Sequence, residues 1–402
     1  MNVSFWPPLQ LLVNARIARE ILYTFDSETL ANGDFYNDQL KEKVSRIRLS
    51  VRPYVCSTCT NSTEHQKLLP LPTNIQTKLV YVALEIGLEI EKWFINHEGF
   101  LESRTNFIVR NILSWRSTGI IDRLETARGL IRNENLHIIY RFLFACEYYF
   151  EEDAQKLWTK MPEYYRIKYR MKWQREDMRH WLNALDNRTA LDWEQISLNI
   201  TGELFFISNA MGIPYFFPRL QGREIRYECI LSGLELVKGS LRPFDLYICL
   251  HQLSADELND VFTRLPKQIL HIVFESFLNW PLQIMFLDVT DSFKTHIDGE
   301  IFLSLICVLL DILECGYEEY EYVDLLKSFW EAFSSQYSSF IEKNEILNKI
   351  VNYVLNAPLP FNVQDCGNFI SNVRKKEIRE VGGRKRTLLE IFNPWSVPTN
   401  LI

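Results

Sequence analysis

The sequence predicts an all-α fold of irregular stacked helical hairpins, an α-solenoid-like array. Three observations favour it. Apolar residues recur at three- and four-residue steps along most of the chain, the strict alternation typical of strands is scarce, and a 23-residue pattern occurs twice. Because a hairpin buries its apolar face only against a neighbour, repeated hairpins are expected to stack.

Helical periodicity is clearest over residues 75–94, where one stripe contains Leu79, Val82, Ala83, Ile86, Ile90 and Trp93. The same spacing predicts helices over residues 9–25, 106–115, 120–131, 136–150, 162–185, 193–211, 266–278, 299–313, 322–333 and 346–355. Only residues 44–51 and 227–230 alternate enough to suggest strands.

Proline-rich breaks suggest where this array divides. The longest covers residues 52–73 and contains Pro53, Pro70 and Pro72 among many Ser, Thr and Asn residues. We predict six segments: N-terminal helices (1–51), a Pro/Ser/Thr-rich loop (52–73), a first helical-repeat unit (74–213), a break (214–223), a second helical-repeat unit (224–373) and a basic C-terminal tail (374–402).

An internal repeat joins residues 140–162 to residues 244–266, which align without a gap at an offset of 104. Both copies end on a threonine, a basic residue, an apolar residue and a proline. The pattern predicts a helix, a tight acidic turn, a short helix and then a helix that begins after the proline. A looser third copy covers residues 301–330.

Stacked hairpins create extended surfaces, so we predict a non-enzymatic scaffold that binds protein partners. The candidate partner-binding residues follow the first repeat copy: Tyr164, Tyr165, Arg166, Tyr169, Arg170 and Trp173. They lie within residues 156–181, where basic and aromatic residues interleave. This composition also suits RNA or single-stranded DNA, which is the alternative prediction. We favour an amphipathic helix because the whole chain has a net charge of −7.

A second alternative concerns residues 264–278, which resemble the start of an F-box. Leu265 and Pro266, followed by Ile269, Leu270, Ile272 and Phe274, carry the resemblance. In the F-box family these residues pack against an adaptor of a ubiquitin ligase. Here the motif is short and overlaps the repeat, so we interpret it first as a repeat helix.

Cys56, Cys59 and His65 form the one cluster that suggests a metal. A CxxC pair supplies two thiolates and His65 a third ligand, but a structural zinc site needs four. No further CxxC or HxxxH follows, and no phosphate-binding, protease or kinase motif occurs. We therefore predict no metal, no cofactor and no enzymatic activity.

Neither a membrane span nor a signal peptide is evident: no apolar run reaches about 18 residues, and the first residues lack a basic region. Most of the eight cysteines lie in apolar stretches, which favours a reducing, cytoplasmic location. Residues 374–386 contain seven cations and two carboxylates. This segment suggests either a nuclear-import signal or a tail that docks on acidic residues, which Asp311, Glu314, Glu318, Glu319, Glu321 and Asp324 supply.

Residues 115–162 resemble a pattern of a large family of uncharacterised arachnid helical proteins. The resemblance rests on Gly119, Ile121, Asp122, Thr126, Ala127, Leu130, Ile131, Leu136, Arg141, Phe142, Ala145, Cys146, Tyr149, Glu152, Asp153, Leu157, Trp158 and Pro162. It implies a helical-repeat scaffold and no particular activity. Residues 133–150 are also similar in style to the second helix of an ankyrin repeat, although the TPLH turn and a 33-residue period are absent.

Overall fold

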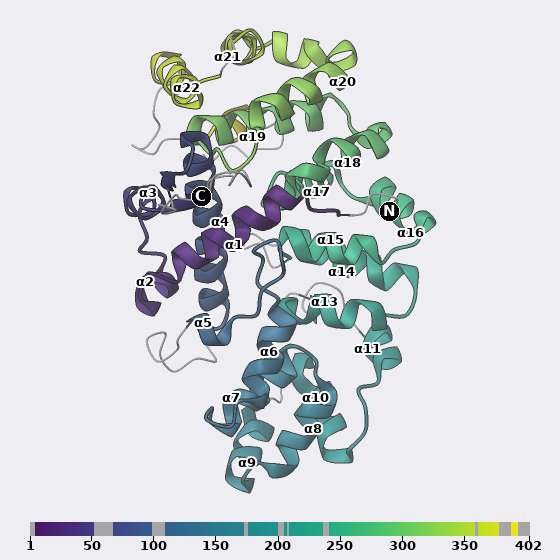
Figure 1. The fold of residues 1–402 in the computed structure, drawn as a ribbon. Coiled ribbons are helices and arrows are strands. Elements are labelled where there is room, and N and C mark those ends of the chain that lie inside the picture. The colour runs from purple at the N-terminus through teal and green to yellow at the C-terminus, as the bar shows by residue number, and fades with distance from the viewer. Residues whose placement is uncertain are drawn as a thin grey trace, which may run out of the picture. The chain divides into compact units, whose positions relative to one another are not determined.

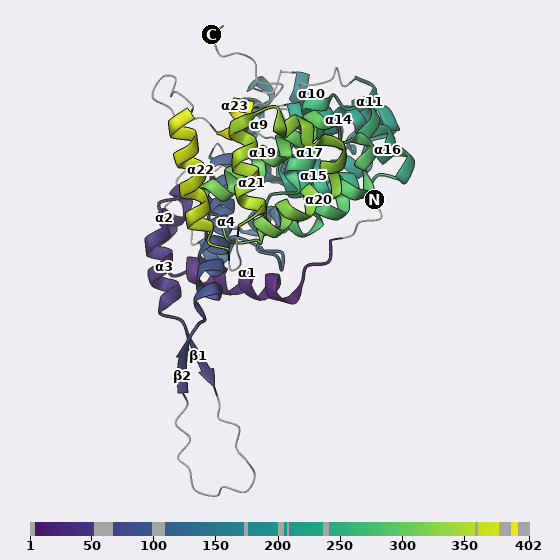
Figure 2. The same ribbon diagram turned by 90° about the horizontal axis from the view of Figure 1, so that it is seen from above.

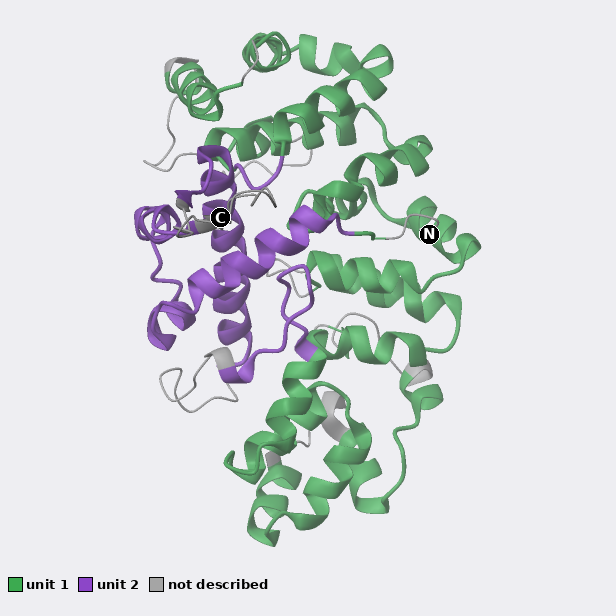
Figure 3. Ribbon diagram, in the orientation of Figure 1, with its two compact units in different colours: residues 1–6, 124–317, 321–402 green, residues 7–123, 318–320 purple. Residues whose placement is uncertain are grey.

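A computed structural model describes residues 5–51, 67–98, 109–172, 176–199, 205–206, 209–235, 241–357, 361–377 and 387–392. These residues form an all-α fold of irregular stacked helical hairpins, as predicted (Figure 1). The chain divides into two compact units (Figure 3). Unit 2 comprises residues 7–123 and 318–320, and unit 1 comprises residues 1–6, 124–317 and 321–402.

Unit 2 is built around one long helix. Its elements are α1 (Leu9–Leu22), α2 (Ser27–Asn32), α3 (Asn37–Ser45), β1 (Arg48–Val51), β2 (Lys67–Pro70), α4 (Thr73–Asn96) and α5 (Val109–Ile112). Helices α1, α2 and α3 all pack on α4. The predicted stripe of α4 is buried throughout, together with Val80 and Phe94. At Gly87 a Cβ atom would lie 2.3 Å from the Phe35 ring, so this close approach requires glycine.

A two-stranded antiparallel ribbon extends from the helices of unit 2 (Figure 2). Arg48 pairs with Pro70 and Val51 pairs with Lys67. The strand predicted over residues 44–51 is therefore confirmed for its second half, while Val44 is a buried residue in the last turn of α3. Of the predicted loop 52–73, residues 52–66 lie outside the described residues.

Unit 1 contains the internal repeat. Its elements are α6 (Arg123–Arg132), α7 (Ile138–Glu147), α8 (Glu151–Lys160), α9 (Glu163–Lys172), α10 (Glu176–Asn187), α11 (Trp193–Asn199), η2 (Ala210–Gly212), α13 (Ile213–Phe216), η3 (Phe217–Arg219), α14 (Arg223–Glu235), α15 (Pro243–His251), α16 (Ala255–Arg264), α17 (Lys267–Ser276), η4 (Leu282–Met285), α18 (Phe286–Ser292), η5 (Lys294–His296), α19 (Gly299–Cys315), α20 (Tyr322–Glu342), α21 (Glu345–Leu355), α22 (Val363–Glu377) and α23 (Leu388–Phe392).

The two repeat copies have the same local structure. Helices α8 and α16 begin and end 104 residues apart, and so do α9 and α17. Between them, Met161 and Leu265 are both extended, with ψ of 134° and 133°. The matched apolar pairs are buried in both copies: Phe142 and Leu246, Leu157 and Val261, Trp158 and Phe262, Met161 and Leu265. The sequence repeat thus corresponds to a structural repeat of three helices, α7–α9 in the first copy and α15–α17 in the second.

Aromatic residues gather around the α7–α8 turn of the first copy. Tyr149 is fully buried with φ of 56°, and its hydroxyl donates to Asn209 Oδ1 at 2.7 Å. The rings around it belong to His180, Trp181, Trp193, Phe205 and Phe216. Much of the chain's high aromatic content therefore fills the core of unit 1.

Three predictions of segment boundaries differ from the structure. Residues 227–230 belong to α14 and not to a strand, because buried Tyr227, Ile230 and Leu234 repeat at helical steps. The looser third copy consists of two longer helices, α19 and α20. The predicted break 214–223 contains α13, η3 and a turn at Gly222, whereas the compact units divide after Arg123.

Candidate protein-interaction site

Helix α9 carries most of the predicted partner-binding residues. It begins after Pro162, and the carbonyl of Pro162 accepts from the Tyr165 N–H at 3.0 Å. Figure 1 shows α9 beside α7 and α8, at the lower edge of unit 1 in that view. Of the six predicted residues, Trp173 lies outside the described residues.

The three tyrosines of α9 have different environments. Tyr164 is 71% exposed. Tyr165 is half-buried, with its ring 5.6 Å from the ring of His137. Tyr169 was expected on the surface and is instead in the core, where its ring lies 5.8 Å from that of Phe142. Tyr169 points inward because it follows Tyr165 by four residues on the packed face of the helix.

The two arginines differ, and only Arg170 has a carboxylate partner among the contacts that the structure describes. Arg170 donates from Nη2 to Asp186 Oδ1 at 2.7 Å and from Nε to Asp186 Oδ2 at 3.1 Å. This hydrogen bonding to Asp186 raises the pKa of the Arg170 guanidinium. The same group lies 5.6 Å from the ring of Trp158. Arg166 is half-buried. The basic character that the sequence suggested is therefore partly used to hold α9 against α8 and α10.

Two apolar residues that sequence reasoning missed complete the exposed face. Ile167 is 47% exposed and Met171 is 71% exposed. With Tyr164 they occupy positions i, i+3 and i+7, which lie on one side of a helix. We call Tyr164, Ile167 and Met171 the α9 stripe. Lys168 lies beside it and is exposed.

The repeat allows a comparison with the second copy. The α17 residues equivalent to the α9 stripe are Gln268, His271 and Glu275. Gln268 is exposed, Glu275 is half-buried and His271 is buried. This burial lowers the pKa of His271 to about 4. The three positions are therefore apolar and exposed in the first copy, but polar and partly buried in the second.

The F-box-like segment is a packed repeat helix. Leu265, Leu270 and Phe274 are buried, while Ile269 and Ile272 are half-buried. Because α17 contacts α14, α15, α18 and α19, most of the motif faces its own unit. Of the motif residues, an adaptor could reach the exposed Pro266 and the two half-buried isoleucines.

Two residues of the predicted acidic cluster, Asp311 and Glu314 on α19, contact the described part of the C-terminal segment. Glu314 Oε1 accepts from Arg374 Nη2 at 2.5 Å, and both side chains are nearly fully buried. Asp311 accepts from the backbone N–H groups of Leu388 and Leu389, at 2.7 and 2.9 Å. Burial raises the pKa of Asp311 to about 6. The part of the tail that the structure describes therefore packs on α19 as α22 and α23.

No three metal-ligating side chains gather anywhere in the described part of the chain. Cys56, Cys59 and His65 lie outside it. Burial raises the pKa of Cys146, Cys229, Cys249 and Cys307, which keeps these thiols protonated. Within the same described ranges, no helix combines the length and apolar composition of a membrane span.

Comparisons with protein-family models, with curated proteins and with solved structures found no match to this chain. The resemblance of residues 115–162 to arachnid helical proteins therefore stays a prediction.

Proposed function

We propose that this chain is a non-enzymatic scaffold that binds a protein partner through the α9 stripe. The observation that carries the proposal is the exposure of Tyr164, Ile167 and Met171 on one face of a well-packed helix. Exposed apolar groups that are contiguous, and not scattered singly, mark interaction surfaces. Tyrosine and methionine are also enriched at such interfaces.

The geometry favours an apolar groove as the partner's contacting element. In helix-in-groove recognition, one helix places its residues at i, i+3 and i+7 in a groove of the other protein. The α9 stripe has this spacing, so α9 would supply the helix and the partner would supply the groove. Acidic residues at the edge of that groove would lie near Lys168.

The nucleic-acid alternative has less support. Base stacking would need exposed aromatic faces, but Tyr169 is buried and Tyr165 packs beside His137. Arg170, a candidate for phosphate contact, forms an ion pair with Asp186. Among the residues of 156–171, one exposed tyrosine with Lys160 and Lys168 makes a poor platform for single strands.

The proposal is tested with the variant Tyr164→Ser/Ile167→Ser/Met171→Ser. Affinity capture from native cells, with quantitative mass spectrometry, compares it with the wild type and with the control Tyr36→Ser/Ile95→Ser. The control removes apolar residues that are 67% and 49% exposed in unit 2. We expect a partner that the stripe variant loses and the control retains, and direct titration should show at least a roughly tenfold weaker Kd.

Equal capture by all three proteins would contradict the proposal. A labelled 20-nucleotide RNA provides the other arm of the test. Salt-sensitive RNA binding that disappears in Lys168→Ala would favour the nucleic-acid alternative. Circular dichroism of each variant confirms that the exposed substitutions leave the fold intact.

A further inference from the structure

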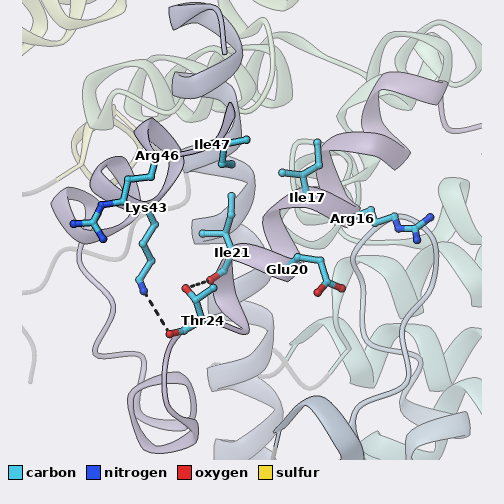
Figure 4. Close-up of a pocket in the computed structure, with 8 residues that line it drawn as sticks. All are labelled: Arg16, Ile17, Glu20, Ile21, Thr24, Lys43, Arg46 and Ile47. Carbon is cyan, nitrogen blue, oxygen red and sulfur yellow. Dashed lines mark hydrogen bonds between the residues drawn. The ribbon is translucent and has the colours of Figure 1, made fainter. Parts of the chain in front are cut away.

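Unit 2 contains a groove between α1 and α3 with a volume of about 540 Å³ (Figure 4). Three isoleucines lie at its centre: Ile17 and Ile21 from α1, and Ile47 just after α3. Ile21 is buried, and the other two are half-exposed. The groove therefore offers an apolar floor to a ligand.

The apolar surface continues beyond the groove along α1. Leu9 is 75% exposed and Val13 is 45% exposed, and both precede Ile17 at four-residue steps. The row from Leu9 to Ile21 spans twelve residue-to-residue steps, or about 18 Å at the rise of an α-helix. This length matches three turns of a helix and exceeds that of a compact small molecule.

Cations flank the floor on both sides. Arg16 projects on the α1 side, and Lys43 and Arg46 stand on the α3 side (Figure 4). Arg16 is exposed and pairs with no carboxylate among the residues that the structure describes. Lys43 Nζ contacts only neutral groups there, the Thr24 carbonyl oxygen at 3.4 Å and the Phe25 ring at 4.2 Å.

Two carboxylates lie near these cations, and each has a basic neighbour. Glu20 lines the groove and lies 3.6 Å from Arg19. Glu42 forms an ion pair with Arg46. Arg16 and Lys43 are then left as positive charges on opposite edges of an apolar floor. A complementary ligand has an apolar centre and negative charges on both sides.

We propose that this groove binds an amphipathic helix of a partner protein, whose acidic residues flank its apolar stripe. We infer a helix from the length of the apolar row, and acidic flanks from the cations on both sides of it. This surface belongs to unit 2 and is separate from the α9 stripe, so the proposal does not depend on the function proposed above. A scaffold with both surfaces would bind two partners.

The test uses a displayed library of 18-residue helices with a fixed leucine stripe. Each position beside the stripe varies among Glu, Lys and Gln. The library is selected on the full-length wild type, on Arg16→Glu/Lys43→Glu and on Lys92→Glu, which reverses an exposed charge on α4. We expect glutamate at the flanks for the wild type and the control, and lysine for the double variant.

Fluorescence anisotropy then measures the affinity of an enriched peptide for each protein. We expect the double variant to bind it roughly tenfold or more weakly than the wild type does. If that variant does not fold, Ile17→Ser, which keeps every charge, should show a similar loss. Selection of the same peptides by all three proteins would overturn the proposal, as would the absence of acidic flanks. Binding to phosphatidylserine vesicles without peptide binding would assign the groove to membranes instead.

Discussion

At the scale of single residues, Glu314 and Arg374 form a buried ion pair between α19 and α22. The side chains are 4% and 7% exposed, so neither charge is well solvated. Ser371 Oγ donates to the same Glu314 oxygen at 2.5 Å. A buried ion pair adds little net stability, but removing one partner leaves the other charge buried without a counter-charge.

Glu314→Ala should therefore lower the free energy of unfolding by about 3 kcal/mol or more. The matched control is Asp291→Ala, which removes the exposed pair with Lys294, where the side chains are 81% and 65% exposed. That change should cost below about 0.5 kcal/mol. Urea unfolding measures both, and equal losses in the two variants would show that Arg374 is not buried as described.

Glu147 gives a prediction about pH. Its carboxyl, at the end of α7, is largely removed from water, and burial raises its pKa from 4.5 to about 7. Because the folded pKa exceeds the unfolded one, the folded state loses stability as pH rises from about 4.5 to 7. Glu147→Gln removes this titration.

The wild type should therefore become less stable relative to Glu147→Gln across that pH window, by at most roughly 3 kcal/mol. Thermal or urea unfolding from pH 4 to pH 8 measures the difference. Glu152→Gln, at an exposed site on α8, controls for the loss of a surface charge. A difference that does not change with pH would contradict the assignment.

The sequence predicted correctly whether a side chain is buried or exposed only where helical periodicity marked a single apolar face. Tyr164 and Tyr169 have the same side chain on one helix, yet only Tyr164 is exposed. Helix α9 carries apolar residues on two faces, and the sequence does not say which face packs. Ile167 and Met171 were missed for that reason, although their spacing from Tyr164 could have drawn attention to them.

At the scale of elements, the repeat predicted from the sequence has matching helix boundaries in the structure. Helix α16 starts with a capping box, in which Ser254 Oγ accepts from the Glu257 N–H at 3.3 Å and Glu257 Oε2 accepts from the Ser254 N–H at 3.0 Å. The first copy has Phe150 at this position and no side-chain cap. The two copies thus keep the same helix boundaries with different local contacts.

Ser254→Ala should lower the free energy of unfolding by about 1 kcal/mol, the usual effect of losing an N-terminal cap. Ser45→Ala is the control, since Ser45 donates to the Glu42 carbonyl in the last turn of α3 and caps no helix start. It should change stability by less than about 0.5 kcal/mol. Denaturation that affects both serine variants equally would argue against the capping box.

The prediction of an element was wrong where a short pattern is compatible with both a strand and a helix. Four residues over 227–230 alternate like a strand, but the longer spacing of Tyr227, Ile230 and Leu234 is helical. Short windows cannot separate the two periods, and tertiary burial decides between them. The alternation over residues 44–51 predicted β1 correctly for Arg48–Val51, but residues 44 and 45 belong to α3.

At the scale of the whole molecule, the fold class followed from periodicity and from the repeat, whereas the division into units did not. Proline-rich breaks suggested a boundary at residues 214–223, and the two compact units of the structure divide after Arg123. A boundary depends on which helices pack together, and this is a property of distant residues. The proposed function depends on the same information, because only packing shows which apolar stripe stays exposed.

Site-specific photo-crosslinking in native cells tests the central claim most directly. A benzoylphenylalanine group replaces Tyr164 in the α9 stripe and, in a control protein, Tyr36, which is 67% exposed in unit 2. We predict a discrete crosslinked complex with another protein from position 164 and none from position 36. The absence of a crosslinked protein at position 164, or the same products from both positions, would contradict the assignment of α9 as the partner-binding surface.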